Sequence, residues 1–160
     1  MPSSQAKTDA SLGGFSGRGL GWAWIALSLS LAIHVIDEAM TDFLSVYNPT
    51  ALAIREWFPF FPLPVFTFEE WLSGLIGAVL LLLLLSPFAF RGGKWVRMLS
   101  YPFGILMLGN GLLHIGASRH LGRAMPGVYS SPLLLVSSIY LLMCVRQRNR
   151  GMKCFERKAN

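Results

Sequence analysis

The sequence predicts an all-α fold, a four-helix transmembrane bundle with a short interfacial helix and loop between spans one and two. The first observation is the distribution of charge, because the 14 Lys/Arg and 8 Asp/Glu residues are clustered. Between the clusters lie four windows free of these residues, at positions 19–36, 71–90, 98–118 and 124–145. Each window is close to the ~20 residues that a helix needs to cross ~30 Å of hydrocarbon. The second observation is a run of leucines at positions 80–85, which leaves no polar face for a water-soluble helix.

The third observation is that the basic residues occupy alternate loops. Most of them lie before the first window, between the second and third windows, or after the fourth, and only Arg55, Arg119 and Arg123 lie in the other loops. The positive-inside rule then predicts that both termini lie in the cytoplasm. The net charge of +6 arises from residues that flank the spans, so membrane lipids are the expected partners and nucleic acid is not.

A chain of 160 residues is expected to form one domain, because shorter pieces could not bury a core. We expect a disordered, Ser/Gly-rich cytoplasmic N-terminus at residues 1–19, a four-helix membrane domain at 20–148, and a basic cytoplasmic tail at 149–160. Cys144 and Cys154 have the spacing of neither a redox pair nor a zinc site.

The first span is expected to cover residues 20–44, because no helix breaker follows the first window. Asn48 and Pro49 then predict the cap and first turn of a short interfacial helix at residues 50–58. The segment that follows, 59–64, is rich in proline and phenylalanine, so we expect it to lie on the outer membrane surface or to cap the bundle.

The other three spans have recognisable ends. Thr67 and Glu70 have the spacing of a capping box at the start of the second span, which ends at the basic turn 91–94. The third span contains Pro102, which membrane helices tolerate. Ser131 followed by proline predicts the start of the fourth span.

Two spans carry polar side chains at matching depths. His34, Asp37 and Glu38 share one face of the first span, and Asn110 and His114 lie one above the other on the third. With a rise of ~1.5 Å per residue, both sets lie ~3–11 Å outward of the membrane midplane. Ionisable groups at this depth are costly and usually mark a functional site. We therefore expect the two sets to form one shared site in the outer half of the bilayer.

These polar residues resemble the sequence elements of the HXXEE family of bacterial integral membrane proteins. The matching segments, in order, are His34-Val35-Ile36-Asp37-Glu38, Asn110-Gly111-Leu112-Leu113-His114 and Tyr129-Ser130-Ser131-Pro132. They correspond to the family's HXXEE, NXXXH and Tyr-Ser-Pro-Gly elements, except that Asp37 replaces the first glutamate and no glycine follows Pro132. The resemblance implies a multi-pass protein of the bacterial inner membrane, and it implies no particular reaction.

The first functional hypothesis is a membrane-embedded enzyme that acts on a lipid-soluble small molecule. The candidate metal ligands are His34, Asp37, Glu38 and His114, and the candidate catalytic residues are His34, Glu38 and Asn110. Imidazole and carboxylate groups are the ligands that zinc and iron accept, so a divalent metal, zinc or iron, is the expected cofactor. Asn110 would orient a ligand or stabilise an oxyanion, and Glu38 would act as general base if no metal binds.

Two other hypotheses remain open at the level of the sequence. The polar cluster could relay protons or hold a ligand in a small binding or transport module, which would need a homo-oligomer to form a pathway. Alternatively, the cluster could be a packing device, in which an ion pair and interhelical hydrogen bonds fix the arrangement of the spans.

Overall fold

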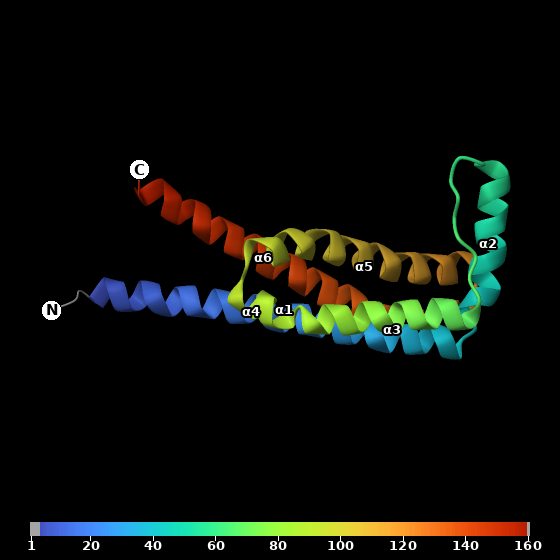
Figure 1. Ribbon diagram of the computed structural model, residues 1–160, viewed down its shortest axis with the longest axis horizontal. Helices are drawn as coiled ribbons and strands as arrows, with labels where there is room; N and C mark the ends of the chain where they lie inside the picture. The colour runs from blue at the N-terminus through green and yellow to red at the C-terminus, as the bar shows by residue number, and fades with distance from the viewer. Residues whose placement is uncertain (1–3, 160) are drawn as a thin grey trace.

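The fold is all-helical over the part of the chain described by the computed structural model, which gives the backbone of residues 4–159 and the side chains of residues 18–148. The helices are α1 (Ser4–Met40), α2 (Phe43–Trp57), α3 (Phe68–Leu84), α4 (Ser86–Arg91), α5 (Lys94–Leu121) and α6 (Ser131–Ala159). α4 continues the direction of α3, so α1, α3–α4, α5 and α6 form four long rods that lie lengthwise beside one another (Figure 1). The predicted four-helix fold class is confirmed.

The contacts between helices place α1 and α6 at the centre of the arrangement. α6 packs against both α1 and α5, and α1 packs in addition against α3 and α4. α1 begins and α6 ends at the same end of the bundle, whereas α2 lies across the opposite end (Figure 1). α1 and α5 make few direct contacts. Any side-chain interaction between these two helices therefore contributes strongly to fixing their relative position.

Among the described residues, three segments are long and apolar enough to cross a membrane: Arg18–Met40, Phe68–Arg91 and Lys94–Leu121. α6 is not among these three segments. The described side chains of this helix end with two charged ones, Arg146 and Arg148, close together. In the most apolar window of Phe68–Arg91 only 11% of the residues are buried, which leaves large leucines such as Leu80 and Leu84 on the surface. Continuous apolar surface of this kind is rare on water-soluble monomers and suits contact with lipid.

Small and polar side chains hold the helices together in the interior. Ser30 of α1 and Ser137 of α6 share a hydrogen bond of 2.7 Å between their hydroxyl oxygens. A Cβ atom at Gly104 of α5 would lie only 2.9 Å from Leu142 of α6, so these two helices approach closely there. Small residues and interhelical hydrogen bonds are the usual means of packing helices in lipid.

Trp24 of α1 provides a further tie, because its indole Nε1 donates a hydrogen bond of 2.8 Å to the Leu82 carbonyl of α3. The indole is almost fully buried. An indole N–H that is buried away from water needs such an acceptor, so this contact fixes α1 against α3.

The first span ends earlier than the sequence predicted. α1 stops at Met40 rather than at residue 44, because Asp42 adopts a left-handed backbone conformation with φ 54° and ψ 55°. Asp visits this region more readily than most residues that carry a Cβ atom. The break turns the chain into α2, which runs across the end of the bundle.

The interfacial helix is also longer than predicted, and Asn48 does not cap it. α2 begins at Phe43, so Pro49 lies inside the helix rather than at its first turn. The Asn48 amide instead donates to the Phe66 carbonyl at 2.9 Å and accepts from the Phe66 amide at 3.1 Å. The side chain is therefore used to hold the returning segment before α3 against α2.

The other predicted helix ends agree with the structure. The hydroxyl of Thr67 accepts from the Glu70 amide, and the Glu70 carboxylate accepts from the Thr67 amide, which forms the expected capping box. α6 begins at Ser131, as predicted. The backbone of α1 begins at Ser4, and the disorder expected for residues 1–19 stays a prediction. The side chains before Arg18 and those of the expected tail, 149–160, lie outside the described residues.

Candidate functional site

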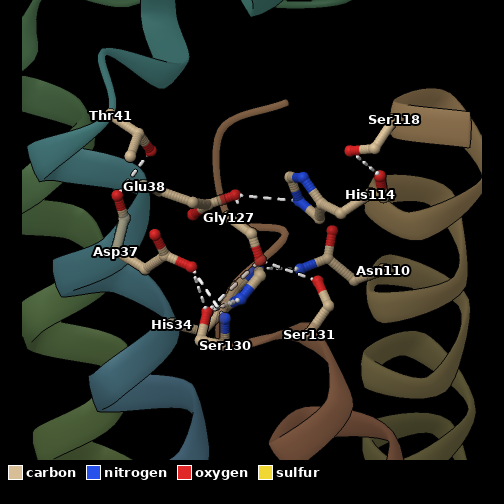
Figure 2. Close-up of polar contacts among 10 residues, drawn as sticks. All are labelled: His34, Asp37, Glu38, Thr41, Asn110, His114, Ser118, Gly127, Ser130 and Ser131. Carbon is tan, nitrogen blue, oxygen red and sulfur yellow. Dashed lines mark hydrogen bonds and ion pairs between the residues drawn. The ribbon is translucent and has the colours of Figure 1, made fainter. Parts of the chain in front are cut away.

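Three ionisable side chains from α1 and α5 converge near the end of the bundle at which α2 lies. The ligand atoms of His34, Glu38 and His114 all lie within 4.8 Å of one another. The Glu38 Oε1 atom is 3.5 Å from His34 Nε2 and 3.1 Å from His114 Nε2. Figure 2 shows Glu38 and His114 pointing toward each other from facing helices. The three residues are shielded from solvent, since the exposed fractions of the whole residues are 0% for His34, 5% for Glu38 and 8% for His114.

The local sequence explains this convergence. His34 and Glu38 are four residues apart on α1, so they lie on one face about one turn apart. Asn110 and His114 have the same spacing on α5. The depths estimated from the sequence also agree, because Asn110 Nδ2 lies 3.1 Å from His34 Nε2. The structure thus brings together the polar residues of the first and third spans in a single cluster.

Ser130, in the turn before α6, joins His34 to Asp37. The Ser130 hydroxyl lies 2.8 Å from His34 Nδ1 and donates to Asp37 Oδ2 at 2.7 Å, and the Ser130 amide donates to the same carboxylate oxygen at 2.8 Å. A hydroxyl has one proton to donate. If the hydroxyl gives that proton to an ionised Asp37, it can only accept from His34, so Nδ1 carries the imidazole proton.

With an ionised Asp37, this arrangement favours one tautomer of His34. With the proton on Nδ1, the Nε2 atom presents a lone pair toward Glu38, and the 3.5 Å contact between Nε2 and Oε1 holds no proton. In this tautomer Nε2 accepts a hydrogen bond of 3.1 Å from the Asn110 amide. An anchored Nδ1–H is typical of metal-binding histidines, and a metal ion at Nε2 would take the place of the hydrogen bond from Asn110.

Asp37 does not join the three converging ligands. Its carboxylate is bound by the Ser130 amide and hydroxyl, and it is not part of the group within 4.8 Å. The structure therefore places Asp37 outside the group of converging ligands. Its carboxylate contacts His34 indirectly, through the hydroxyl of Ser130. Asn110, expected to orient a ligand, lies beside His34 Nε2.

Gly127 brings the backbone of the segment between α5 and α6 into the middle of the cluster. Its φ is +78°, a left-handed conformation that glycine adopts without steric cost. A Cβ atom at this position would lie 3.0 Å from each of Glu38 Cγ, His34 Cε1 and His114 Cε1. No larger residue fits here unless the three candidate ligands move, and the backbone of residue 127 covers them (Figure 2).

The other side of His114 is covered by aromatic rings. Phe43, the first residue of α2, has its ring centroid 5.9 Å from that of His114 and stacks on Trp71 of α3 at 5.7 Å. Ser118 fastens the neighbouring turn, because its hydroxyl donates to the His114 carbonyl and accepts from the Met125 amide. The cluster is thus enclosed by α2, α3 and the segment before α6.

Some residues of this site were not selected from the sequence. Ser130 belongs to the Tyr129–Pro132 element, which was the available signal, but its link to His34 depends on how residues 122–130 return across the bundle. Gly127 and Phe43 carry no local pattern that marks them as site residues. Tyr129 in the same element is 73% exposed and does not contribute to the cluster.

The arrangement is chemically suited to a cation. Asp37 and Glu38 bring two carboxylates, and neither Arg119 nor Arg123, both exposed, forms an ion pair with them among the described side chains. A tetrahedral zinc ion with bonds of ~2.0–2.1 Å has ligand atoms about 3.3 Å apart. The two distances from Glu38 Oε1, 3.1 Å and 3.5 Å, lie on either side of that value. The third distance, between the ligand atoms of the two imidazoles, is bounded only by 4.8 Å. A small divalent ion would therefore draw His34 and His114 closer together around Glu38.

Comparison of the chain with protein-family models, with curated proteins and with solved structures gives no match. The functional argument therefore rests on the residues and geometry of the cluster.

Proposed function

We propose that the protein is a multi-pass protein of the bacterial inner membrane whose His34, Glu38 and His114 bind a divalent metal, zinc or iron. The metal would serve an enzymatic reaction on a lipid-soluble substrate. α6 would be the fourth span, both termini would lie in the cytoplasm, and the metal centre would lie in the outer half of the bilayer. The resemblance to the HXXEE family supports the bacterial membrane location and the choice of site residues.

The observation that carries the proposal is the convergence of three buried ligand atoms from α1 and α5 within 4.8 Å. The orientation of His34 strengthens it, because the hydrogen bond of Nδ1 to Ser130 leaves Nε2 facing the centre. Histidines that bind a metal through one ring nitrogen usually donate a hydrogen bond from the other ring nitrogen.

The number of ligands favours catalysis over a purely structural metal. Structural zinc sites have four protein ligands, whereas catalytic sites have three and leave one position for a substrate or water. A metal held by His34, Glu38 and His114 would polarise a carbonyl or phosphoryl oxygen and would activate water. Asn110 lies beside His34 and could donate to a polarised oxygen. Since all three ligands are buried, a substrate would reach them only when the packing around the cluster opens.

A measurement of metal content tests the metal centre. We would purify the full-length protein and count metal ions per chain for wild type, His34→Ala and His114→Ala. His120→Ala is the matched control, because His120 is an exposed histidine on the same helix as His114. We expect about one zinc or iron ion per chain in wild type and control, and a large loss in both site variants. Equal metal content in all four proteins, or none in wild type, would refute the metal centre.

A packing role is the second candidate, and one distance favours it. Glu38 Oε1 and His114 Nε2 are 3.1 Å apart, which is a hydrogen-bond distance without any metal. A Glu38 carboxylate shared between two histidines could by itself hold α1 against α5, which make few other contacts. In that case the double change Asp37→Asn with Glu38→Gln alters thermal stability, while wild type contains no stoichiometric metal.

A further inference from the structure

A dense group of aromatic side chains lies at the end of α2 and in the loop that follows it. Residues 57–68, the aromatic segment, contain six aromatic residues, three prolines and no charged residue. The exposed fractions are 82% for Trp57, 97% for Phe60 and 64% for Phe61. The aromatic segment therefore does not cap the bundle, which was one of the two placements that the sequence left open. Exposed apolar surface of this kind marks a site of contact with a protein or a membrane.

The position of the aromatic segment suits contact with lipid. α2 runs across the end of the bundle and reaches past α5, and the loop that returns to α3 lies on the side of α2 that faces the rest of the bundle (Figure 1). With the long helices across a membrane, as proposed above, α2 lies parallel to the membrane surface. The loop then lies beside the outer ends of the spans, on the side of α2 where the acyl chains begin.

The residues on either side of the aromatic segment mark the level of the lipid headgroups. Glu56 precedes the segment, and Glu69 and Glu70 follow at the start of α3, and all three are exposed. Further along α3 the exposed side chains are apolar, among them Ile76 and Leu80. Aromatic residues between charged groups and a lipid-facing apolar surface have the order found at the boundary of a membrane.

The backbone of the aromatic segment has few unpaired donors, as a segment with little water around it requires. Its three prolines have no N–H group to donate. Four other amides donate hydrogen bonds within the protein, those of Phe58 at 2.8 Å, Phe61 at 2.9 Å, Leu63 at 2.8 Å and Phe66 at 3.1 Å. A loop in water does not need this pairing, whereas an unpaired amide at the edge of the hydrocarbon is costly.

The loop is also held against α2 by side chains. The Tyr47 hydroxyl donates to the Pro64 carbonyl at 3.1 Å, and the Tyr47 ring stacks on Phe66 with centroids 6.0 Å apart. Asn48 adds its two hydrogen bonds to the backbone of Phe66. The exposed rings of the aromatic segment are therefore presented by a loop with a fixed shape.

We propose that the aromatic segment inserts into the outer leaflet of the membrane, with Trp57, Phe58, Phe60 and Phe61 at the boundary between headgroups and acyl chains. Aromatic rings favour this boundary, and a segment that lies in the membrane plane binds there through its buried apolar area. The insertion would hold α2, whose first residue Phe43 covers His114, at a fixed depth. This inference rests on the proposed placement in the membrane and is independent of the metal centre.

The accessibility of spin labels tests the insertion on the full-length protein in phosphatidylcholine vesicles. After Cys144→Ser and Cys154→Ser, single cysteines are introduced as Phe60→Cys or Phe61→Cys and labelled with a nitroxide. Oxygen concentrates in hydrocarbon, whereas a nickel chelate stays in water. We expect the ratio of oxygen to nickel accessibility at both positions to be several-fold higher than at the control position.

Glu56→Cys is the matched control, because this exposed residue of α2 directly precedes the aromatic segment and is expected at the level of the headgroups. Leu80→Cys on the exposed face of α3 tests the placement of the chain in the membrane. A label at position 80 that is reached by nickel and not favoured by oxygen would refute that placement, and the insertion with it.

The other outcomes concern the insertion alone. A high ratio at positions 60, 61 and 80 with a low ratio at position 56 supports it. A high ratio at position 80 with equally low ratios at positions 56, 60 and 61 overturns it and leaves the loop in water. Immobile labels at positions 60 and 61 that neither reagent reaches also overturn it, and spin–spin coupling between copies would then assign the aromatic segment to contact with a second copy of the chain.

Discussion

The imidazole rings of His34 and His114 meet edge to face, with their centroids 4.9 Å apart and their planes at 74°. They belong to α1 and α5, two helices that make few other contacts. The contact therefore joins two elements through side chains that can also bind a metal with Glu38. The three side chains come from two helices, Ser130 orients His34 among them, and the backbone of Gly127 lies against all three.

Ser130→Ala tests whether the orientation of His34 matters. The change removes the partner of His34 Nδ1 and one of the two hydrogen bonds to Asp37. We expect metal affinity to fall by about 10- to 100-fold, as is usual when such a partner of a metal-binding histidine is lost. Competition with a chelating dye measures the affinity.

The control for this experiment is Ser138→Ala. Ser138 is likewise a buried serine, within α6, and among the described residues its hydroxyl donates to the Leu134 carbonyl of the same helix and has no contact with the cluster. An equal loss of affinity in the two variants would show that Ser130 has no special relation to His34.

Gly127→Ala tests the close approach of the backbone to the three ligands. The added Cβ would lie 3.0 Å from atoms of all three, and the left-handed backbone would also be strained. The strain costs about 1–2 kcal/mol and crowding adds about 1–3 kcal/mol. At about 2–4 °C per kcal/mol, we expect a clear fall in the melting temperature together with weaker metal binding.

Gly122→Ala separates the two effects. Gly122 has φ +63° and nothing within 4 Å of the added Cβ, so it has the backbone strain without the crowding. We expect a smaller fall in the melting temperature and unchanged metal binding. If both glycine variants lose metal alike, the cause is not contact with the ligands.

Removal of metal should destabilise the protein. A ligand that binds only the folded state stabilises it according to its concentration and affinity, by about 2.7 kcal/mol at a hundred times the dissociation constant. We expect a chelator to lower the melting temperature of wild type and to leave that of Glu38→Gln unchanged. A response of Glu38→Gln as large as that of wild type would assign the effect to metal bound elsewhere.

Cysteine labelling tests the proposed orientation in the membrane. After Cys144 and Cys154 are replaced by serine, single cysteines are placed at Arg55 on α2 and at Lys94 at the start of α5. These residues belong to opposite ends of the bundle (Figure 1). A reagent that does not cross the inner membrane should label position 55 in spheroplasts and label position 94 only after lysis. The reverse pattern would contradict cytoplasmic termini.

The sequence was sufficient for the main features of the fold and for the centre of the site. Charge-free windows follow directly from the cost of polar groups in lipid, so the long helices could be predicted. The face shared by His34 and Glu38, and its match in depth with His114, follow from helix periodicity alone. These relationships require no knowledge of tertiary packing.

Other features depend on contacts between distant segments. The break at Asp42 has no glycine or proline to mark it, and Asn48 bonds to Phe66 rather than capping α2. Ser130 reaches His34 only because residues 122–130 return over the end of the bundle. A local sequence pattern does not predict which distant residue a turn will contact. The roles of Asp42, Asn48 and Ser130 therefore became visible only in the structure.

X-ray absorption spectroscopy of the zinc-loaded, full-length protein tests the central claim most directly. The account predicts nitrogen and oxygen ligands at ~2.0–2.1 Å and outer-shell scattering from two imidazole rings, which falls to one ring in His114→Ala. The same spectrum should remain unchanged in His120→Ala. A zinc environment without imidazole scattering, or one that is identical in His114→Ala and wild type, would contradict a metal centre formed by His34, Glu38 and His114.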